Sequence, residues 1–370
     1  MRSCGQGLLA ASAAVSILGT CIAADVARNH GLDSSAQMQP LQGAARAGRE
    51  DTRFFAAVAL GLFGHPPDPS AAEADMREIA DLGSTGVVLP VFWRSDDYRS
   101  TRIGPFAYGV PQSAYDDSEV EIARRAHALG LSFEVLPILQ IDRLGPGEWR
   151  GTLAPSDWAS WWRSYRSFVL HHAEVAERAG AEILSVGSEL GTTESDRARW
   201  SELIAAVRRF YRGRLIYSAN WDHYRSVGFW DLLDGVGLSA YYELADDPSA
   251  SQSAIDAAWR SHRETILAWA RPLGKPLYLT EVGYPAQPGA AVHPWDYTLS
   301  EPADVVAQAR CYRAFTEAWR GVPELSGVTI WLWDHGKGGP SDPSYAIRGK
   351  PAAKLVAEFF RARTGPPSPR

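Results

Sequence analysis

The chain has 370 residues, 45% of them hydrophobic and 22% charged, a composition that excludes a largely disordered protein and allows a large buried core. Its 37 basic and 43 acidic residues give a net charge of −6, and no basic run is present that would follow a phosphate backbone, so nucleic acid is not an expected partner. The 14 tryptophans and 14 tyrosines are many for this length; besides core packing, such rings provide flat surfaces that stack on sugars.

The first 24 residues are typical of a secretory leader rather than of a folded element. A weakly apolar stretch over residues 8–24 follows one basic residue and is too short and too rich in small residues to span a membrane. Residues 18–21 (LGTC) resemble a bacterial lipobox, in which Cys21 would become the lipidated first residue; ordinary cleavage after Ala23 or Ala24 is the alternative. We therefore expect a secreted or envelope-anchored bacterial protein, in the periplasm, at the outer membrane or outside the cell, that contacts a membrane only through a lipid at Cys21.

Three further segments follow this leader. Residues 25–50, rich in Ala, Gly, Gln and Ser, are interpreted as a flexible tether, residues 51–364 as one folded domain, and residues 365–370 as a tail. Once the leader is removed, Cys311 is the only cysteine besides Cys21, so no internal disulfide is expected. Cys311 lies in an apolar helical pattern and is expected to be a buried core thiol.

Apolar, β-branched and aromatic runs alternate with helical patterns from residue 54 onward. The runs predict eight strands, over residues 54–63, 85–93, 131–142, 181–190, 214–221, 233–242, 275–284 and 327–334. Asp68 and Pro69 are expected to begin a helix that Gly83 ends, and Gly130, Gly180, Gly213 and Gly274 to end four others. Strand–helix units repeated in this way favour a single (β/α)8 TIM barrel; a doubly wound open sheet is the alternative, but no GxGxxG follows the first strand.

Two glutamates lie at the carboxyl ends of expected strands, where such barrels carry their chemistry. Glu189, in SVGSELG, ends the fourth strand, and Glu281, in LTEVGYPA, ends the seventh. Strict alternation would place Glu189 on one face with Ile183, Ser185 and Gly187, and Glu281 on one face with Leu277 and Leu279. A surface position is the more common one for a single glutamate, but two at these strand ends are what a glycosidase needs.

Other strand ends supply side chains suited to binding a sugar. The candidate substrate-binding residues are Trp93, Asn220, Trp221, Tyr241, Tyr242, Trp331, Trp333 and Asp334. Trp331 and Trp333 are expected on one face of the eighth strand, and either Tyr241 or Tyr242 would donate to Glu281. Packing within a loop or core is the alternative for Trp93 and, more so, for Trp149, which lies beside Arg150 after the third strand.

The order of SVGSELG, IYSANWD, GLSAYY, LTEVGYPA and IWLWD, with GEWRG after the third strand and RGKPA after the eighth, resembles glycoside hydrolase family 113 over residues 54–360. The resemblance implies a retaining (β/α)8 glycosidase with endo-β-1,4-mannanase activity, Glu189 as acid/base and Glu281 as nucleophile. In the wider clan, an Asn that bonds the sugar 2-hydroxyl commonly precedes the acid/base, whereas this chain has Ser188.

The sequence thus predicts an exported retaining β-glycanase that cleaves β-mannan or glucomannan without a cofactor. That mechanism leads us to expect a raised pKa for Glu189 and a low one for Glu281. The alternatives are a related barrel glycosidase acting on β-glucan or galactan, and a catalytically silent glycan-binding barrel. No HExxH and no P-loop is present, and His171 and His172 point in different directions on their helix, so no metal site is expected.

Overall fold

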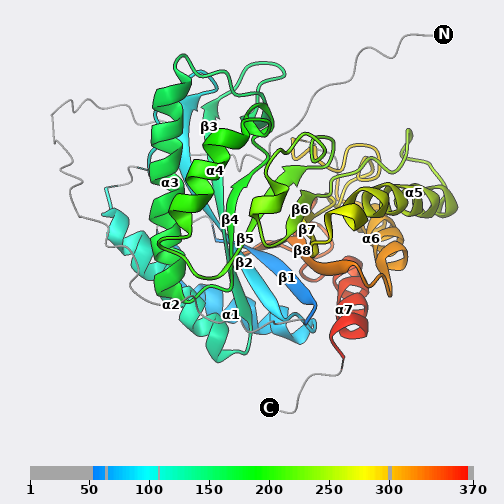
Figure 1. The fold of residues 1–370 in the computed structure, drawn as a ribbon. Helices are drawn as coiled ribbons and strands as arrows, with labels where there is room; N and C mark the ends of the chain where they lie inside the picture. Colours follow the sequence, from blue (N-terminus) through cyan, green and yellow to red (C-terminus); the bar gives the residue numbers. More distant parts are fainter. Residues whose placement is uncertain (1–52, 63–65, 107–108, 299–301, 366–370) are drawn as a thin grey trace, which may run out of the picture.

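Eight parallel strands form a closed barrel in which each strand pairs with the next in the chain and β8 returns to β1 (Figure 1). This computed structural model describes residues 53–62, 66–106, 109–298 and 302–365, so the expected leader and tether lie outside the described residues. The strands are β1 (Phe55–Gly61), β2 (Gly86–Asp97), β3 (Ser132–Arg143), β4 (Ile183–Ser188), β5 (Arg214–Asn220), β6 (Val236–Ser239), β7 (Leu277–Val282) and β8 (Leu325–Asp334). The expected (β/α)8 barrel is confirmed, and each expected strand overlaps an observed one.

Helices surround the barrel and connect its strands (Figure 1). They are α1 (Pro69–Asp81), α2 (Gln112–Ala128), α3 (Trp158–Ala179), α4 (Arg197–Val207), α5 (Gln252–Ala270), α6 (Val305–Trp319) and α7 (Pro351–Thr364). Short 3₁₀ helices are η1 (Arg150–Thr152), η2 (Gly191–Thr193), η3 (Trp230–Leu232) and η4 (Arg271–Leu273). The described crossover from β5 to β6 contains η3 and no α-helix.

The expected helix boundaries hold at most positions. Asp68 caps α1 through a bond from the Ser70 amide, with Pro69 as its first residue. Gly180 ends α3 in the left-handed conformation at φ 67°. Gly213 does not end a helix: α4 stops at Val207, and Gly213 directly precedes β5, where the Tyr211 ring lies against it.

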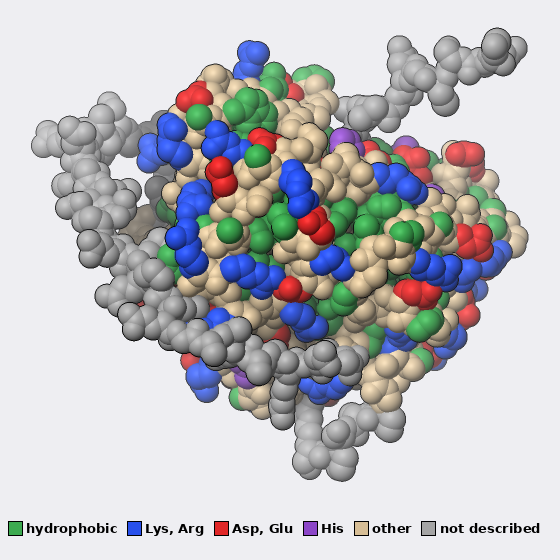
Figure 2. Space-filling model, in the orientation of Figure 1, with side chains coloured by type: hydrophobic (Ala, Val, Ile, Leu, Met, Phe, Trp, Pro, Cys, Tyr) green, Lys and Arg blue, Asp and Glu red, His purple; other side chains and the backbone are tan. Residues whose placement is uncertain are grey.

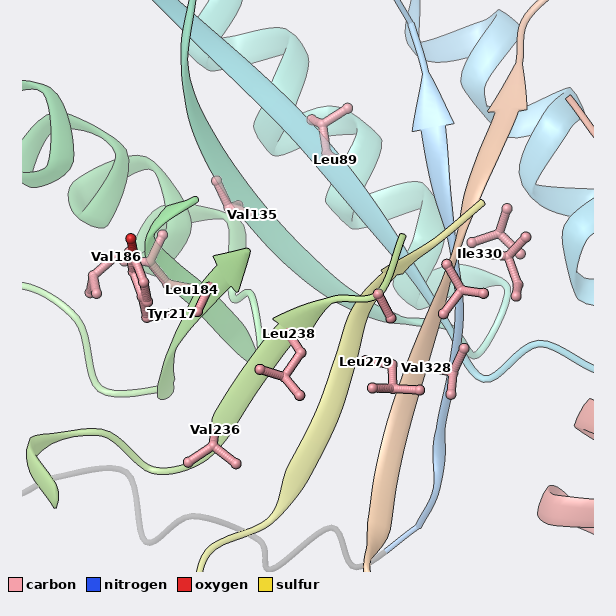
Figure 3. Close-up of a cluster of buried hydrophobic side chains, with 14 of the residues drawn as sticks. Leu89, Val135, Leu184, Val186, Tyr217, Val236, Leu238, Leu279, Val328 and Ile330 are labelled. Atoms are coloured by element: carbon pink, nitrogen blue, oxygen red, sulfur yellow. The ribbon is translucent and has the colours of Figure 1, made fainter. Parts of the chain in front are cut away.

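Alternating side chains divide the hydrophobic residues of the strands into two clusters. The outer cluster joins strands to helices and includes Leu89, Val135, Leu184, Leu238 and Leu279 (Figure 3). The inner cluster comes mainly from the strands and fills the barrel: Phe55, Ala57, Ala59, Val88, Leu136, Ile138, Ile183, Ile216, Tyr241, Tyr278, Trp331, Leu332 and Tyr345. Cys311 is buried in the outer cluster, as expected. Polar groups that point into the barrel must therefore be held among apolar neighbours.

The molecular surface carries charges of both signs. Figure 2 shows basic and acidic side chains interspersed with apolar ones on the visible face. In the part of the chain that the structure describes, no helix is long and apolar enough to cross a membrane.

Candidate active site

Glu281 reaches the barrel interior through an irregularity in β7. Leu238 of β6 pairs with Leu279, but the next residue, Ser239, pairs with Glu281, so one extra residue is accommodated in β7. Leu277 and Leu279 pack in the outer cluster, whereas Tyr278 packs in the inner cluster. The expectation that Glu281 shares a face with the two leucines is therefore wrong. The extra residue reverses the alternation and brings the carboxyl group inward.

Glu189 follows a similar irregularity in β4. Ser185 pairs with Ile216 of β5, but Ser188 pairs with Ser218, which again leaves one extra residue. A Cβ atom on Gly187 would lie 2.4 Å from the Tyr165 hydroxyl of α3, so Gly187 faces outward and not inward with Ile183 as expected. Glu189 itself has φ 56° and is the only described non-glycine residue with a positive φ. Its carboxyl position thus depends on a sharp turn rather than on simple alternation.

Two side chains hold the Glu189 carboxylate. Arg150 of η1 donates to Oε2 at 2.5 Å, and the Ser239 hydroxyl donates to Oε1. The Arg150–Glu189 ion pair is almost completely buried, with both side chains only 5% exposed. Since Ser239 also pairs with Glu281 across β6 and β7, it places the two glutamates beside each other at the barrel mouth.

The Glu281 carboxyl group is less fully bonded. Tyr241 donates to Oε2 at 3.0 Å, which shows that Tyr241, and not Tyr242, faces the expected nucleophile. Oε1 and the Ser188 hydroxyl are both buried and form no hydrogen bond of normal length, although Ser188 lies close enough to Glu281 to lower its pKa. A buried acceptor without a donor is uncommon and marks a position where another group can bind.

Burial and then the neighbouring charge of Glu189 raise the pKa of Glu281 to about 8, against smaller opposing effects of Arg150, Tyr241 and Ser188. The expected low pKa of Glu281 is therefore wrong for the free protein. The Arg150 cation bonds to Glu189 and not to Glu281. Burial and the neighbouring carboxylate therefore favour the protonated form of Glu281 in the free protein.

The expected sugar-binding residues separate into an inner and an outer set. Trp331, joined to Leu332 by a cis peptide bond, packs in the inner cluster. Trp333 packs in the outer cluster with Arg348 over its ring, so the two tryptophans do not share a face as expected. Val58 of β1 pairs with Ile330, but Leu60 pairs with Trp333, so β8 gains one residue between these two pairs. This extra residue changes the alternation between Trp331 and Trp333. Asp334 is buried and forms an ion pair with Lys337.

Trp93 is not positioned to bind a substrate in the barrel. Its ring packs against Phe168, His171 and His172 of α3, at centroid distances of 5.3, 5.2 and 5.9 Å. Trp93 follows Val91 and Leu89 on the outward face of β2, while Phe92 packs against the inner cluster. Trp149 packs on its own loop, where its ring covers Gly151.

The three other candidates lie near the end of β5 or β6. Asn220 is buried; its amide donates to Asp222, and its carbonyl oxygen lies 3.4 Å from the Ser239 hydroxyl. Trp221 borders both clusters. Tyr242 faces outward, stacked on His262 at 4.5 Å.

Several site residues were missed from the sequence. The sequence indicates Arg150 only as a loop residue and gives no separate signal for Ser239, although Ser239 lies two residues before Tyr241. Phe92, Trp295 and Tyr297 are partly buried aromatic side chains that, like Trp221, pack against the inner cluster. Trp295 and Tyr297 lie in the segment after β7, which has no periodic pattern that would reveal their position.

Among the described residues, no group of three or more His, Cys, Asp or Glu side chains is arranged to hold a metal ion. The chemistry that the site offers is acid–base and nucleophilic chemistry by two carboxyl groups. A TIM barrel with such a pair at the ends of β4 and β7 has the arrangement of a glycoside hydrolase.

Comparison with known proteins agrees with this class. The model of Glycoside Hydrolase Family 113 matches residues 67–350, and the chain belongs to this family. It is 30% identical to the family 113 β-mannanase AaManA from Alicyclobacillus acidocaldarius, solved in complex with ManMIm; the match covers 84% of this chain and 98% of that one, with a TM-score of 0.75.

Two further solved structures share the fold. A family 113 β-1,4-mannanase is 24% identical, with 84% of this chain and 100% of that one covered and a TM-score of 0.75. A GH5_18 protein from Streptomyces cattleya, in complex with Manβ1-4GlcNAc, is 18% identical, with 86% and 83% covered and a TM-score of 0.57. No curated protein sequence matches the chain.

Proposed function

We propose that this glycoside hydrolase cleaves β-1,4-linked mannan or glucomannan with retention of configuration. The observation that carries the proposal is the buried pair of glutamates joined through Ser239, in which Glu281 Oε1 has no partner. An unbonded carboxylate oxygen is the atom that a nucleophile must present to the anomeric carbon.

In the proposed reaction, Glu189 delivers a proton to the glycosidic oxygen while Glu281 attacks the anomeric carbon. The bond to the leaving sugar breaks and a glycosyl ester on Glu281 forms; Glu189 then removes a proton from the water that hydrolyses this ester. The pKa of Glu281, raised to about 8, supports a pair that enters the reaction with one proton. We propose that this proton is on Glu189 when substrate is bound.

Aromatic side chains and the Ser188 hydroxyl support a neutral mannose polymer as substrate. Phe92, Trp221, Trp295 and Tyr297 provide flat rings against the inner cluster, which suit the apolar faces of pyranose sugars. Mannose differs from glucose in an axial 2-hydroxyl group. We propose that the buried Ser188 hydroxyl, which lies beside Glu281, bonds to it. The relatives named above include β-mannanases, which favours the same substrate.

The test is release of new reducing ends from β-mannan, cellulose and galactan. We expect mannan to be cleaved fastest, and Glu189→Ala and Glu281→Ala each to abolish cleavage. Glu317→Ala on α6, whose side chain is 59% exposed, is the matched control and should retain full activity. Preference for galactan or β-glucan would refute the substrate but not the reaction; binding of a glycan without cleavage would favour a glycan-binding barrel instead.

We also propose that the protein is exported, on the basis of residues 1–24. Mass spectrometry of the native protein should find residues 1–20 removed and Cys21 lipidated at the new N-terminus, or removal up to Ala23 or Ala24 without a lipid. An intact Met1 on cytosolic protein would contradict export.

A further inference from the structure

A third glutamate, Glu194, is buried in the turn after Glu189, and the proposed hydrolysis makes no use of it. Its side chain is 0% exposed, and burial raises its pKa to about 7. Oε1 accepts a hydrogen bond of 2.8 Å from the Tyr217 hydroxyl, and Oε2 accepts one of 3.2 Å from Ser226. A buried carboxyl group is costly to maintain, so its partners are informative about its role.

Tyr217 connects Glu194 to the residue directly after Glu189. Its hydroxyl oxygen accepts a hydrogen bond of 2.8 Å from the Leu190 amide while its proton is donated to Glu194. The Tyr217 ring is fixed between Trp200 and Phe229, at centroid distances of 5.2 and 5.3 Å. The chain of donors therefore runs from Leu190 N–H through Tyr217 O–H to the Glu194 carboxyl oxygen.

This series of hydrogen bonds supports the one strained backbone position in the site. Glu189 has φ 56°, a conformation that a non-glycine residue keeps only where its surroundings impose it. The Glu189 amide donates to the Ser218 carbonyl at 2.8 Å, and the Leu190 amide donates to Tyr217. Both acceptors belong to β5, so the turn is held by two successive amides.

We propose that Tyr217 and Glu194 are positioning residues that keep Glu189 in its left-handed turn and so direct its carboxyl group to the glycosidic oxygen. This inference rests on the proposed acid/base role of Glu189. Neither residue has to touch the substrate: Tyr217 packs in the outer cluster, outside the barrel. Removing the Tyr217 hydroxyl would release the Leu190 amide and allow the turn to relax.

The test compares two aryl β-mannobiosides in Tyr217→Phe. A phenol leaving group requires protonation, whereas 2,4-dinitrophenolate leaves without it, and kcat/KM reports the glycosylation step in both cases. We expect kcat/KM for the phenyl substrate to fall by on the order of 10²-fold, as for a misplaced catalytic group. For the dinitrophenyl substrate we expect a fall of less than about threefold, because Glu281 is unaffected.

Two further variants make the test specific. Tyr211→Phe is the matched control, because it too removes a buried tyrosine hydroxyl. That hydroxyl donates to the Ala181 carbonyl at 2.9 Å, away from the Glu189 turn, so both rates should stay unchanged. Glu194→Leu should reproduce the Tyr217→Phe pattern, and Glu194→Gln, which keeps an acceptor oxygen, should restore most of the phenyl activity.

Equal losses on both substrates, or no loss on either, would overturn the positioning role while leaving the proposed function intact. A wild-type protein that cleaves neither mannan nor either mannobioside would overturn the proposed function and this inference together.

Discussion

At the residue scale, the two glutamates differ in their partners rather than in their burial. Glu189 has a guanidinium and a hydroxyl, whereas Glu281 has one tyrosine hydroxyl and an oxygen without a partner. One cation therefore faces two carboxyl groups. This charge balance favours the uptake of one proton by the pair, which is the protonation state that a retaining glycosidase needs.

We expect kcat/KM for mannan to decline above about pH 8, because the pair loses its last proton near the pKa of Glu281, about 8. A pH–rate profile on a soluble mannooligosaccharide measures this alkaline limb. Constant activity up to pH 10 would show that the pair does not control the reaction in this range.

We expect Arg150→Gln to lower kcat/KM by on the order of 10²-fold, because the Glu189 carboxyl group loses the donor that holds it. The same substitution should move the alkaline limb to higher pH, since Arg150 lowers the pKa of Glu281. Arg178→Gln is the matched control: this residue is 51% exposed and pairs with Asp117 at the surface. An unchanged limb would mean that Arg150 acts on geometry alone.

At the scale of elements, β4 and β7 contain the same irregularity. Each strand gains one residue relative to its partner just before its glutamate, and each glutamate then points into the barrel. In β4 the irregularity also requires a glycine, because a side chain at Gly187 would collide with the Tyr165 hydroxyl of α3. Helix α3 therefore takes part in fixing the turn that contains Glu189.

We expect Gly187→Ala to destabilise the protein by about 1–3 kcal/mol, as overpacking of a filled core does, because its Cβ atom would lie 2.4 Å from the Tyr165 hydroxyl. Gly104→Ala is the control, since its Cβ atom would meet nothing within 4 Å. Urea unfolding of both variants measures the difference. Equal stability of the two would contradict the proposed packing of Gly187.

At the scale of the whole molecule, buried carboxyl groups link stability to pH. Burial raises the pKa values of Glu119, on α2, and Glu134, on β3, to about 8, well above the ordinary value of 4.5. The native state therefore binds more protons than the unfolded state between pH 4.5 and 8. The free energy of unfolding should fall as the pH rises through this window. His172 has the opposite effect on stability, because burial lowers its pKa. Its contribution makes the free energy of unfolding rise with pH, mainly below its ordinary pKa of 6.5.

We expect the melting temperature to fall between pH 6.5 and 8, where the carboxyl groups titrate and His172 is neutral in both states. Glu119→Gln should reduce this slope, since its amide cannot ionise. Differential scanning calorimetry of both proteins at several pH values tests this expectation. A wild-type melting temperature that rises over this interval would contradict it.

The sequence by itself determined the barrel, its eight strands and the two glutamates, because periodicity, helix caps and short motifs are local signals. It did not determine how those glutamates turn inward. The extra residues in β4, β7 and β8 depend on pairing with neighbouring strands, so alternation misplaced Gly187, Leu279 and Trp333.

Only the tertiary structure decided which partners meet at the site. Arg150 converges on the glutamates from the loop after β3, and Ser239 and Tyr241 from the end of β6. Trp93 is directed to α3 by its parity on β2. The raised pKa of Glu281 also depends on these contacts. Burial and neighbouring charge are properties of the packed barrel, and no local stretch of sequence contains them.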